Sequence, residues 1–144
     1  MTVMGNAEIN PELRRIARFI PRQVVYPWSV PLLKRIASPR KGSGDGVETL
    51  TLPSGAGVRL HRPANAPSAT PALLWIHGGG YLFGSPEQDD AMCRRFADRL
   101  GIVVAAARYR LAPEHPYPAA LQDGLSCYHA LLEKGWRADQ IVLG

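Results

Sequence analysis

The strongest chemical signal in the sequence is the run from His77 to Ser85, His-Gly-Gly-Gly-Tyr-Leu-Phe-Gly-Ser. Three consecutive glycines allow backbone conformations that are closed to other residues, and they leave amide N–H groups uncovered by side chains. Such donors suit the negative oxygen that develops during acyl transfer, where one well-placed donor lowers the barrier by about 2.7–4 kcal/mol. In a site of this kind His77 would hold the loop through hydrogen bonds and would not act as the catalytic base.

Two other interpretations of the glycine run have to be weighed. A triple glycine can merely make a tight turn between a strand and a helix, and the run alone does not decide between that turn and an oxyanion site. A phosphate-binding loop is the second alternative. It is disfavoured because the G-x-G-x-x-G spacing and the Gly-Lys-Ser/Thr sequence of a P-loop are both absent.

A second informative segment runs from Arg108 to Ala120, Arg-Tyr-Arg-Leu-Ala-Pro-Glu-His-Pro-Tyr-Pro-Ala-Ala. Together with the glycine run it strongly resembles the hormone-sensitive-lipase-like (bacterial group IV) carboxylesterases and lipases. The segment 58–63 and Asp123 fit the same pattern, and the resemblance covers nearly everything from Val47 onward. It implies an α/β-hydrolase fold and a serine esterase that acts on carboxylic esters, and we expect neither a cofactor nor a metal.

The resemblance also implies roles for individual residues. The backbone N–H groups of Gly79 and Gly80 would be oxyanion donors, with Gly78 and His77 supporting the loop. Four further residues are expected to brace the sheet end and the wall near the site: Tyr109, Arg110, Glu114 and Asp123. Charged groups in such a place should be paired, because an unpaired buried charge is costly.

The catalytic triad itself is not expected within these 144 residues. In this fold the nucleophile lies on a G-x-S-x-G turn, followed in the chain by the acid and then the histidine. No serine of the sequence has glycines two positions away on both sides, and His115 precedes any such turn. We therefore predict the N-terminal part of an esterase, inactive alone, ending before the nucleophile. The alternative is a non-catalytic remnant or interaction module.

The first 45 residues are predicted to form a helical cap and a hinge that precede the main domain. Apolar residues at helical spacing predict helices at residues 11–20 and 31–37, and a glycine-rich hinge follows at 40–46. The first helix has a basic outer face. We favour packing of this helix against the body of the protein, and contact with a lipid surface through it is the alternative.

Residues 46–144 are predicted to form the first half of an α/β-hydrolase domain. The pattern indicates an antiparallel hairpin and then alternating strands and helices, which together give a mostly parallel sheet with flanking helices. The expected strands are 47–52, 58–62, 72–76, 102–107 and 140–143. A capping box at 85–88 should open a helix that ends at Gly101. A second helix, at 119–134, should bury the stripe Leu121, Leu125, Tyr128 and Leu132.

The composition restricts the remaining classes. The net charge is +5, but basic residues are spread along the chain, so we expect no nucleic-acid partner. No apolar run approaches the roughly 20 residues of a membrane span, and no secretory signal is visible, which favours a cytoplasmic protein. Cys93 and Cys127 are expected to be buried free thiols. The sequence leaves the oligomeric state open.

Overall fold

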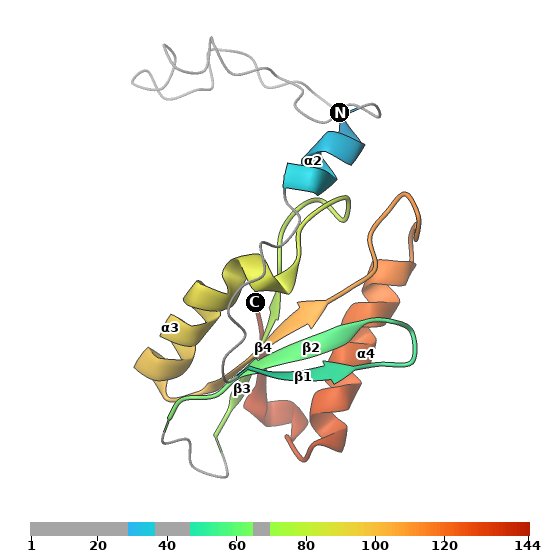
Figure 1. Ribbon diagram of the computed structural model, residues 1–144. Helices are drawn as coiled ribbons and strands as arrows, with labels where there is room; N and C mark the ends of the chain where they lie inside the picture. The colour runs from blue at the N-terminus through green and yellow to red at the C-terminus, as the bar shows by residue number, and fades with distance from the viewer. Residues whose placement is uncertain (1–28, 37–46, 65–69) are drawn as a thin grey trace, which may run out of the picture. The chain divides into compact units, whose positions relative to one another are not determined.

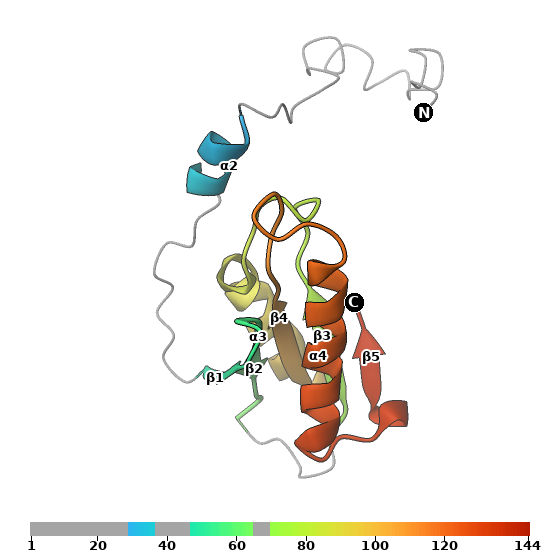
Figure 2. The ribbon, with the colours of Figure 1, turned by 90° about the vertical axis from the view of Figure 1, so that its right-hand side faces the viewer.

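The structure is a computed structural model that describes residues 29–36, 47–64 and 70–144. The predicted helix at 11–20 and the predicted hinge at 40–46 lie outside these residues. Helix α2 (Val30–Ile36) agrees with the predicted second helix. The residues from 47 onward form a mixed five-stranded sheet with one long helix on each face (Figures 1 and 2).

The sheet has the strand order β1-β2-β4-β3-β5. Strands β1 (Glu48–Thr51) and β2 (Gly57–His61) form the predicted hairpin, and β2 also pairs antiparallel with β4 (Val103–Arg108). Strand β3 (Ala72–Ile76) runs parallel to β4 and to β5 (Ile141–Leu143). The prediction of a mixed sheet whose later strands are parallel is therefore confirmed.

The two faces of the sheet carry separate cores. Helix α3 (Asp90–Leu100) packs on one face and helix α4 (Ala119–Glu133) on the other, as the turned view in Figure 2 shows. Because successive side chains of a strand point to opposite faces, β4 contributes to both cores. Its Ala105 and Ala107 join the core under α4, whereas Val104 and Ala106 join the core under α3.

The predicted buried stripe of α4 is wrong. Leu121 and Leu125 are 63% and 56% exposed, and Tyr128 and Leu132 are only partly buried. The face that turns to the sheet carries Ala119, Asp123, Cys127, Ala130 and Leu131. The helix is apolar on two sides, so periodicity alone could not decide which side packs, whereas the need of the Asp123 carboxylate for a buried partner does.

The capping box predicted at 85–88 does not form. A 3-10 turn, η2 (Pro86–Asp89), precedes α3, and the Ser85 side chain makes no capping hydrogen bond. The Oγ of Ser85 is buried without a hydrogen-bond partner among the described residues. Carboxylates of this segment are instead held by donors from the sheet. The end of α3 is as predicted, with Gly101 in the left-handed conformation at φ +63°.

Two other predictions concern the described part of the chain. Cys93 and Cys127 are both buried and free, as expected. Within residues 29–36, 47–64 and 70–144, no helix has the length and apolar character needed to cross a bilayer.

Candidate active site

The glycine run begins directly after β3 and folds into a compact loop. Gly79 and Gly80 adopt φ values of +125° and +60°, and Tyr81 follows at +62°. A Cβ at Gly79 would lie 1.9 Å from the carbonyl oxygen of Phe83, so only glycine fits there. The carbonyl of Gly79 accepts hydrogen bonds from the amides of Leu82 (3.1 Å) and Phe83 (3.3 Å), which closes the turn.

The loop leaves three neighbouring backbone donors uncommitted. Within the described residues, the amide N–H groups of Gly78, Gly79 and Gly80 donate to no backbone or side-chain acceptor. Gly78 and Gly80 are exposed and Gly79 is half-buried, so these adjacent donors face solvent and are available to an external acceptor. An anionic oxygen is the kind of group that such a cluster of N–H dipoles stabilises.

His77 and Tyr109 hold the start of this loop. The hydroxyl of Tyr109 donates to the carbonyl oxygen of His77 at 2.6 Å, and the two rings stack with centroids 4.3 Å apart. The Nδ1 atom of His77 lies 2.8 Å from the carbonyl oxygen of Gly78; because a carbonyl only accepts, Nδ1 carries the proton. Burial lowers the pKa of His77 below its usual value, so the ring is neutral at pH 7. These contacts suit loop support rather than acid–base work.

Arg110 and Asp123 join the end of β4 to α4. The carboxylate of Asp123 is fully buried and accepts from Nε (2.9 Å), Nη2 (2.9 Å) and the backbone N–H (2.8 Å) of Arg110. Burial opposes ionisation, but the hydrogen bonds from Arg110 outweigh it and lower the pKa of Asp123. Glu114, for which a buried bracing position was expected, has a side chain that is 62% exposed. His115 is also exposed.

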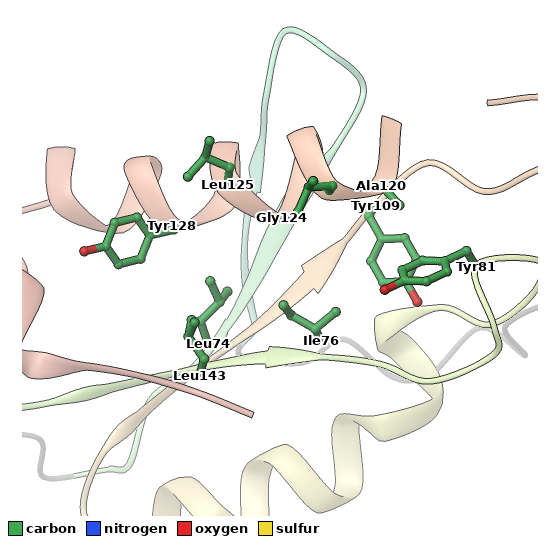
Figure 3. A pocket seen from close by; sticks show the side chains of 10 residues that line it. Leu74, Ile76, Tyr81, Tyr109, Ala120, Gly124, Leu125, Tyr128 and Leu143 are labelled. Carbon is green, nitrogen blue, oxygen red and sulfur yellow. The ribbon is translucent and has the colours of Figure 1, made fainter. Parts of the chain in front are cut away.

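An open apolar cavity of about 510 Å³ lies beside the loop, between α4 and the strands β3 and β5 (Figure 3). Tyr81 and Tyr109 stand at the end nearest the glycine run, and the exposed stripe of α4 forms one wall. The lining residues are Leu74, Ile76, Tyr81, Tyr109, Ala120, Leu121, Gly124, Leu125, Tyr128 and Leu143. The loop donors therefore have an apolar cavity next to them, and an apolar cavity with a few polar groups is the usual form of a small-molecule site.

A charged network that the sequence motifs did not predict lies on the opposite face of the sheet. Arg59 of β2 forms a two-point ion pair with Asp90, and the fully buried His61 places Nε2 at 3.2 Å from the Oδ1 of Asp90. A signal was present in the sequence: alternation along β2 puts Arg59 and His61 on one face, and acidic residues follow the glycine loop at positions 87, 89 and 90.

Comparisons with known proteins agree with this geometry. A family model described as the α/β-hydrolase fold matches residues 73–144, half of the chain. Esterase LipI of Mycobacterium tuberculosis is 38% identical over 81 residues, which cover 55% of this chain and 25% of the relative. Ethyl acetate hydrolase of Pseudomonas putida is 42% identical over 79 residues, covering 54% of this chain and 25% of the relative.

A solved bacterial heroin esterase is 30% identical, with a TM-score of 0.65 over 96% of this chain and 48% of that structure. The chain thus spans about a quarter of the length of the curated relatives it matches and about half of that solved structure. The fold, the geometry of the glycine loop and the similar proteins all indicate the same family. The chain belongs to the α/β-hydrolase fold family, among the hormone-sensitive-lipase-like carboxylesterases and lipases.

Proposed function

We propose that this chain supplies the oxyanion-binding part of a serine carboxylesterase. The observation that carries the proposal is the set of uncommitted amide N–H groups in the glycine run beside an apolar cavity. Gly79 and Gly80 donate to the carbonyl oxygen of the ester as it becomes negative under attack. His77 and Gly78 fix the loop. Tyr109, Arg110 and Asp123 hold the end of β4 that faces it.

The nucleophile is proposed to come from sequence that follows Gly144 in the full-length protein. Gly144 continues the pairing of β5 with β3: Ile76 N donates to Gly144 O at 2.8 Å, and Gly144 N donates to Leu74 O at 3.0 Å. Parallel strands end at the same edge of a sheet, so a turn directly after Gly144 would lie beside the glycine loop. A serine on that turn could attack an ester held by the loop amides.

Under this proposal the 144 residues alone hydrolyse no ester. They supply donors and one wall of a chamber but no nucleophile, general base or carboxylate partner for that base. Loss of the nucleophile or the base costs several orders of magnitude even when the rest of a site is intact. Because one relative is named as an ethyl acetate hydrolase, we propose short acyl esters as the substrate class of the full-length enzyme.

The experiment compares two proteins on p-nitrophenyl butyrate. The first is the 144-residue chain. The second is the same chain joined, after Gly144, to the part of the bacterial heroin esterase that follows the matched region; we call it the joined esterase. We expect hydrolysis by the joined esterase only, and its loss when the serine of the added G-x-S-x-G turn is replaced by alanine. Turnover by the chain alone above a heat-treated control, or a folded but inactive joined esterase, would contradict the proposal.

One observation favours a second function, a non-catalytic interaction module. Leu121 and Leu125 of α4 and Leu143 of β5 are all more than half exposed, which is unusual for neighbouring large apolar residues. A chain that serves as a module should bury this face against another polypeptide. Sedimentation of the 144-residue chain distinguishes the two: a defined complex with a stable stoichiometry favours the module, and a monomer favours the esterase part.

A further inference from the structure

The strongest unexplained feature is the attachment of the segment that leaves the glycine loop. Its first anchor is Arg59 of β2, whose Nε and Nη2 lie 3.0 and 2.5 Å from the two oxygens of Asp90. The Nη1 of Arg59 also lies 3.5 Å from Glu87. The side chain of Arg59 is only 10% exposed, so this pair is poorly screened by solvent.

Two further anchors come from the next strands of the sheet. The indole N–H of Trp75, on β3, donates to the Oδ2 of Asp89 at 2.9 Å. Arg108, the last residue of β4, donates to Glu87. Three strands thus each supply a donor to the acidic residues of η2 and the start of α3. We call these three donors, Arg59, Trp75 and Arg108, the strand clamp.

Close contacts connect the clamped segment to the loop donors. Gly84, at φ +107°, lies so near His77 that a Cβ would meet its Nδ1 at 2.7 Å and the carbonyl oxygen of Gly78 at 2.8 Å. Gly79 is in similar contact with Phe83. The two ends of the loop are therefore packed directly against each other. A shift of the segment after Gly84 must displace the backbone of Gly78 and Gly79, because close-packed groups transmit displacement.

We propose that Arg59 is a positioning residue of the esterase site, acting through Asp90 and Glu87 to fix the direction of the Gly79 and Gly80 amides. The inference rests on the proposed function for its catalytic consequence, but not for its structural part. Arg59 does not line the cavity, and its ion-pair partners Asp90 and Glu87 lie after the glycine loop in the chain. Its planar fork sets both distance and orientation of the Asp90 carboxylate, which a lysine ammonium cannot do.

The structural part is tested in the 144-residue chain labelled with ¹⁵N-glycine. Arg59→Met should shift or broaden the amide signals of Gly79, Gly80 and Gly84, while signals of Gly124 and Gly135, on the α4 side, stay in place. Arg59→Lys should give smaller shifts of the same three signals. The matched control is Arg137→Met, which breaks a two-point pair with Asp139 at 3.0 and 2.9 Å on an exposed turn. It should leave the signals of Gly79, Gly80 and Gly84 unchanged.

The catalytic part is measured in the joined esterase with active sites counted by the p-nitrophenol burst. Misplacement of reacting groups by about 1 Å can cost roughly 100-fold in rate, so Arg59→Met should lower kcat roughly 10- to 100-fold with little change in KM. The kcat of Arg59→Lys should lie between those of Arg59→Met and the unaltered protein. The kcat of Arg137→Met should equal that of the unaltered protein. A variant with fewer active sites but an unchanged kcat per site would show a merely structural residue and overturn the proposal.

The two measurements separate failure of this inference from failure of the proposed function. Should Arg59→Met prevent folding, Trp75→Phe removes one donor of the clamp and keeps an aromatic ring, and the same glycine signals are read. Unmoved loop signals in every folded clamp variant overturn the positioning role, whatever the activity. Loop signals that move while the unaltered joined esterase is inactive support the clamp and contradict the proposed function.

Discussion

Two neighbouring glycines of the loop provide a matched test of its geometry. Gly79 and Gly80 both have positive φ, +125° and +60°, and both are followed by the same turn. Their surroundings differ. A Cβ at Gly79 would meet Phe83 O at 1.9 Å, whereas a Cβ at Gly80 would meet nothing within 4 Å. Gly79→Ala and Gly80→Ala therefore add the same methyl group to one crowded and one open position.

The free energies of unfolding should differ clearly. Gly80→Ala places alanine in the left-handed region, at a cost of about 1–2 kcal/mol, partly offset because alanine restricts the unfolded chain. At Gly79 the overlap is with backbone, so the turn has to open. That breaks the bonds from Leu82 and Phe83 to the Gly79 carbonyl, worth about 0.5–1.5 kcal/mol each. We expect about 1 kcal/mol for Gly80→Ala and roughly 2–4 kcal/mol for Gly79→Ala.

Urea unfolding of the two variants, followed by circular dichroism, measures the difference. The joined esterase provides a second readout, since Gly79→Ala should also abolish hydrolysis of p-nitrophenyl butyrate whereas Gly80→Ala should retain part of it. Equal destabilisation by the two substitutions, or a larger loss for Gly80→Ala, would refute the loop geometry from which the oxyanion proposal starts.

Three further predictions concern the supports of the loop. Tyr109→Phe leaves the buried carbonyl of His77 without its donor and should lower the free energy of unfolding by about 1–3 kcal/mol in urea titrations; no change would mean that water replaces the hydroxyl. Asp123→Asn should lower the melting temperature more than Asp139→Asn, whose pair is exposed, and the reverse order would contradict the bracing role of Asp123. Burial lowers the pKa of both His61 and His77 from 6.5. Below about pH 6.5 these histidines therefore bind protons in the unfolded chain but remain neutral in the folded chain, which favours unfolding. The urea concentration at the unfolding midpoint should therefore decrease as the pH is lowered from about 7 to about 5. A flat profile would show that these rings ionise freely.

The elements that depend on local pattern could be predicted from the sequence. The uniformly apolar segments at 72–76 and 102–107 form the central parallel strands, since continuous apolar runs are typical of strands covered on both faces. Gly101 ends α3 in the left-handed conformation, for which glycine carries no steric penalty. These features follow from a few neighbouring residues, so a single sequence contains the information.

Features that depend on long-range partners could not be predicted. Whether Ser85 caps the helix depends on competition with the sheet donors, because Trp75 and Arg59 hold the segment after it in a 3-10 turn. Likewise, the face of α4 that packs is decided by the pairing of Asp123 with Arg110, 13 residues earlier in the chain. The family resemblance indicated that Asp123 braces the site, but the apolar periodicity of the helix indicated a different buried face. Helical periodicity records apolar positions, but it contains nothing about which buried charge must find which partner.

Tyr81 combines the structural and functional sides of the loop in one residue. It is the one described residue other than glycine with positive φ, +62°, a conformation that costs an ordinary side chain about 1–2 kcal/mol. Its carbonyl accepts from Ala112 N at 2.8 Å, and the residue, 63% exposed as a whole, stands at the loop end of the cavity. Asparagine tolerates this backbone conformation better than tyrosine. Tyr81→Asn should relieve about 1–2 kcal/mol of strain but lose the edge-to-face contact with the Tyr109 ring at 6.1 Å, worth about 0.5–1.5 kcal/mol. The free energy of unfolding should therefore rise by less than about 1 kcal/mol. In the joined esterase the same substitution should raise KM, since a wall of the chamber is lost. Urea unfolding and steady-state kinetics check the two halves, and a less stable variant with an unchanged KM would show that the conformation of Tyr81 serves folding rather than the site.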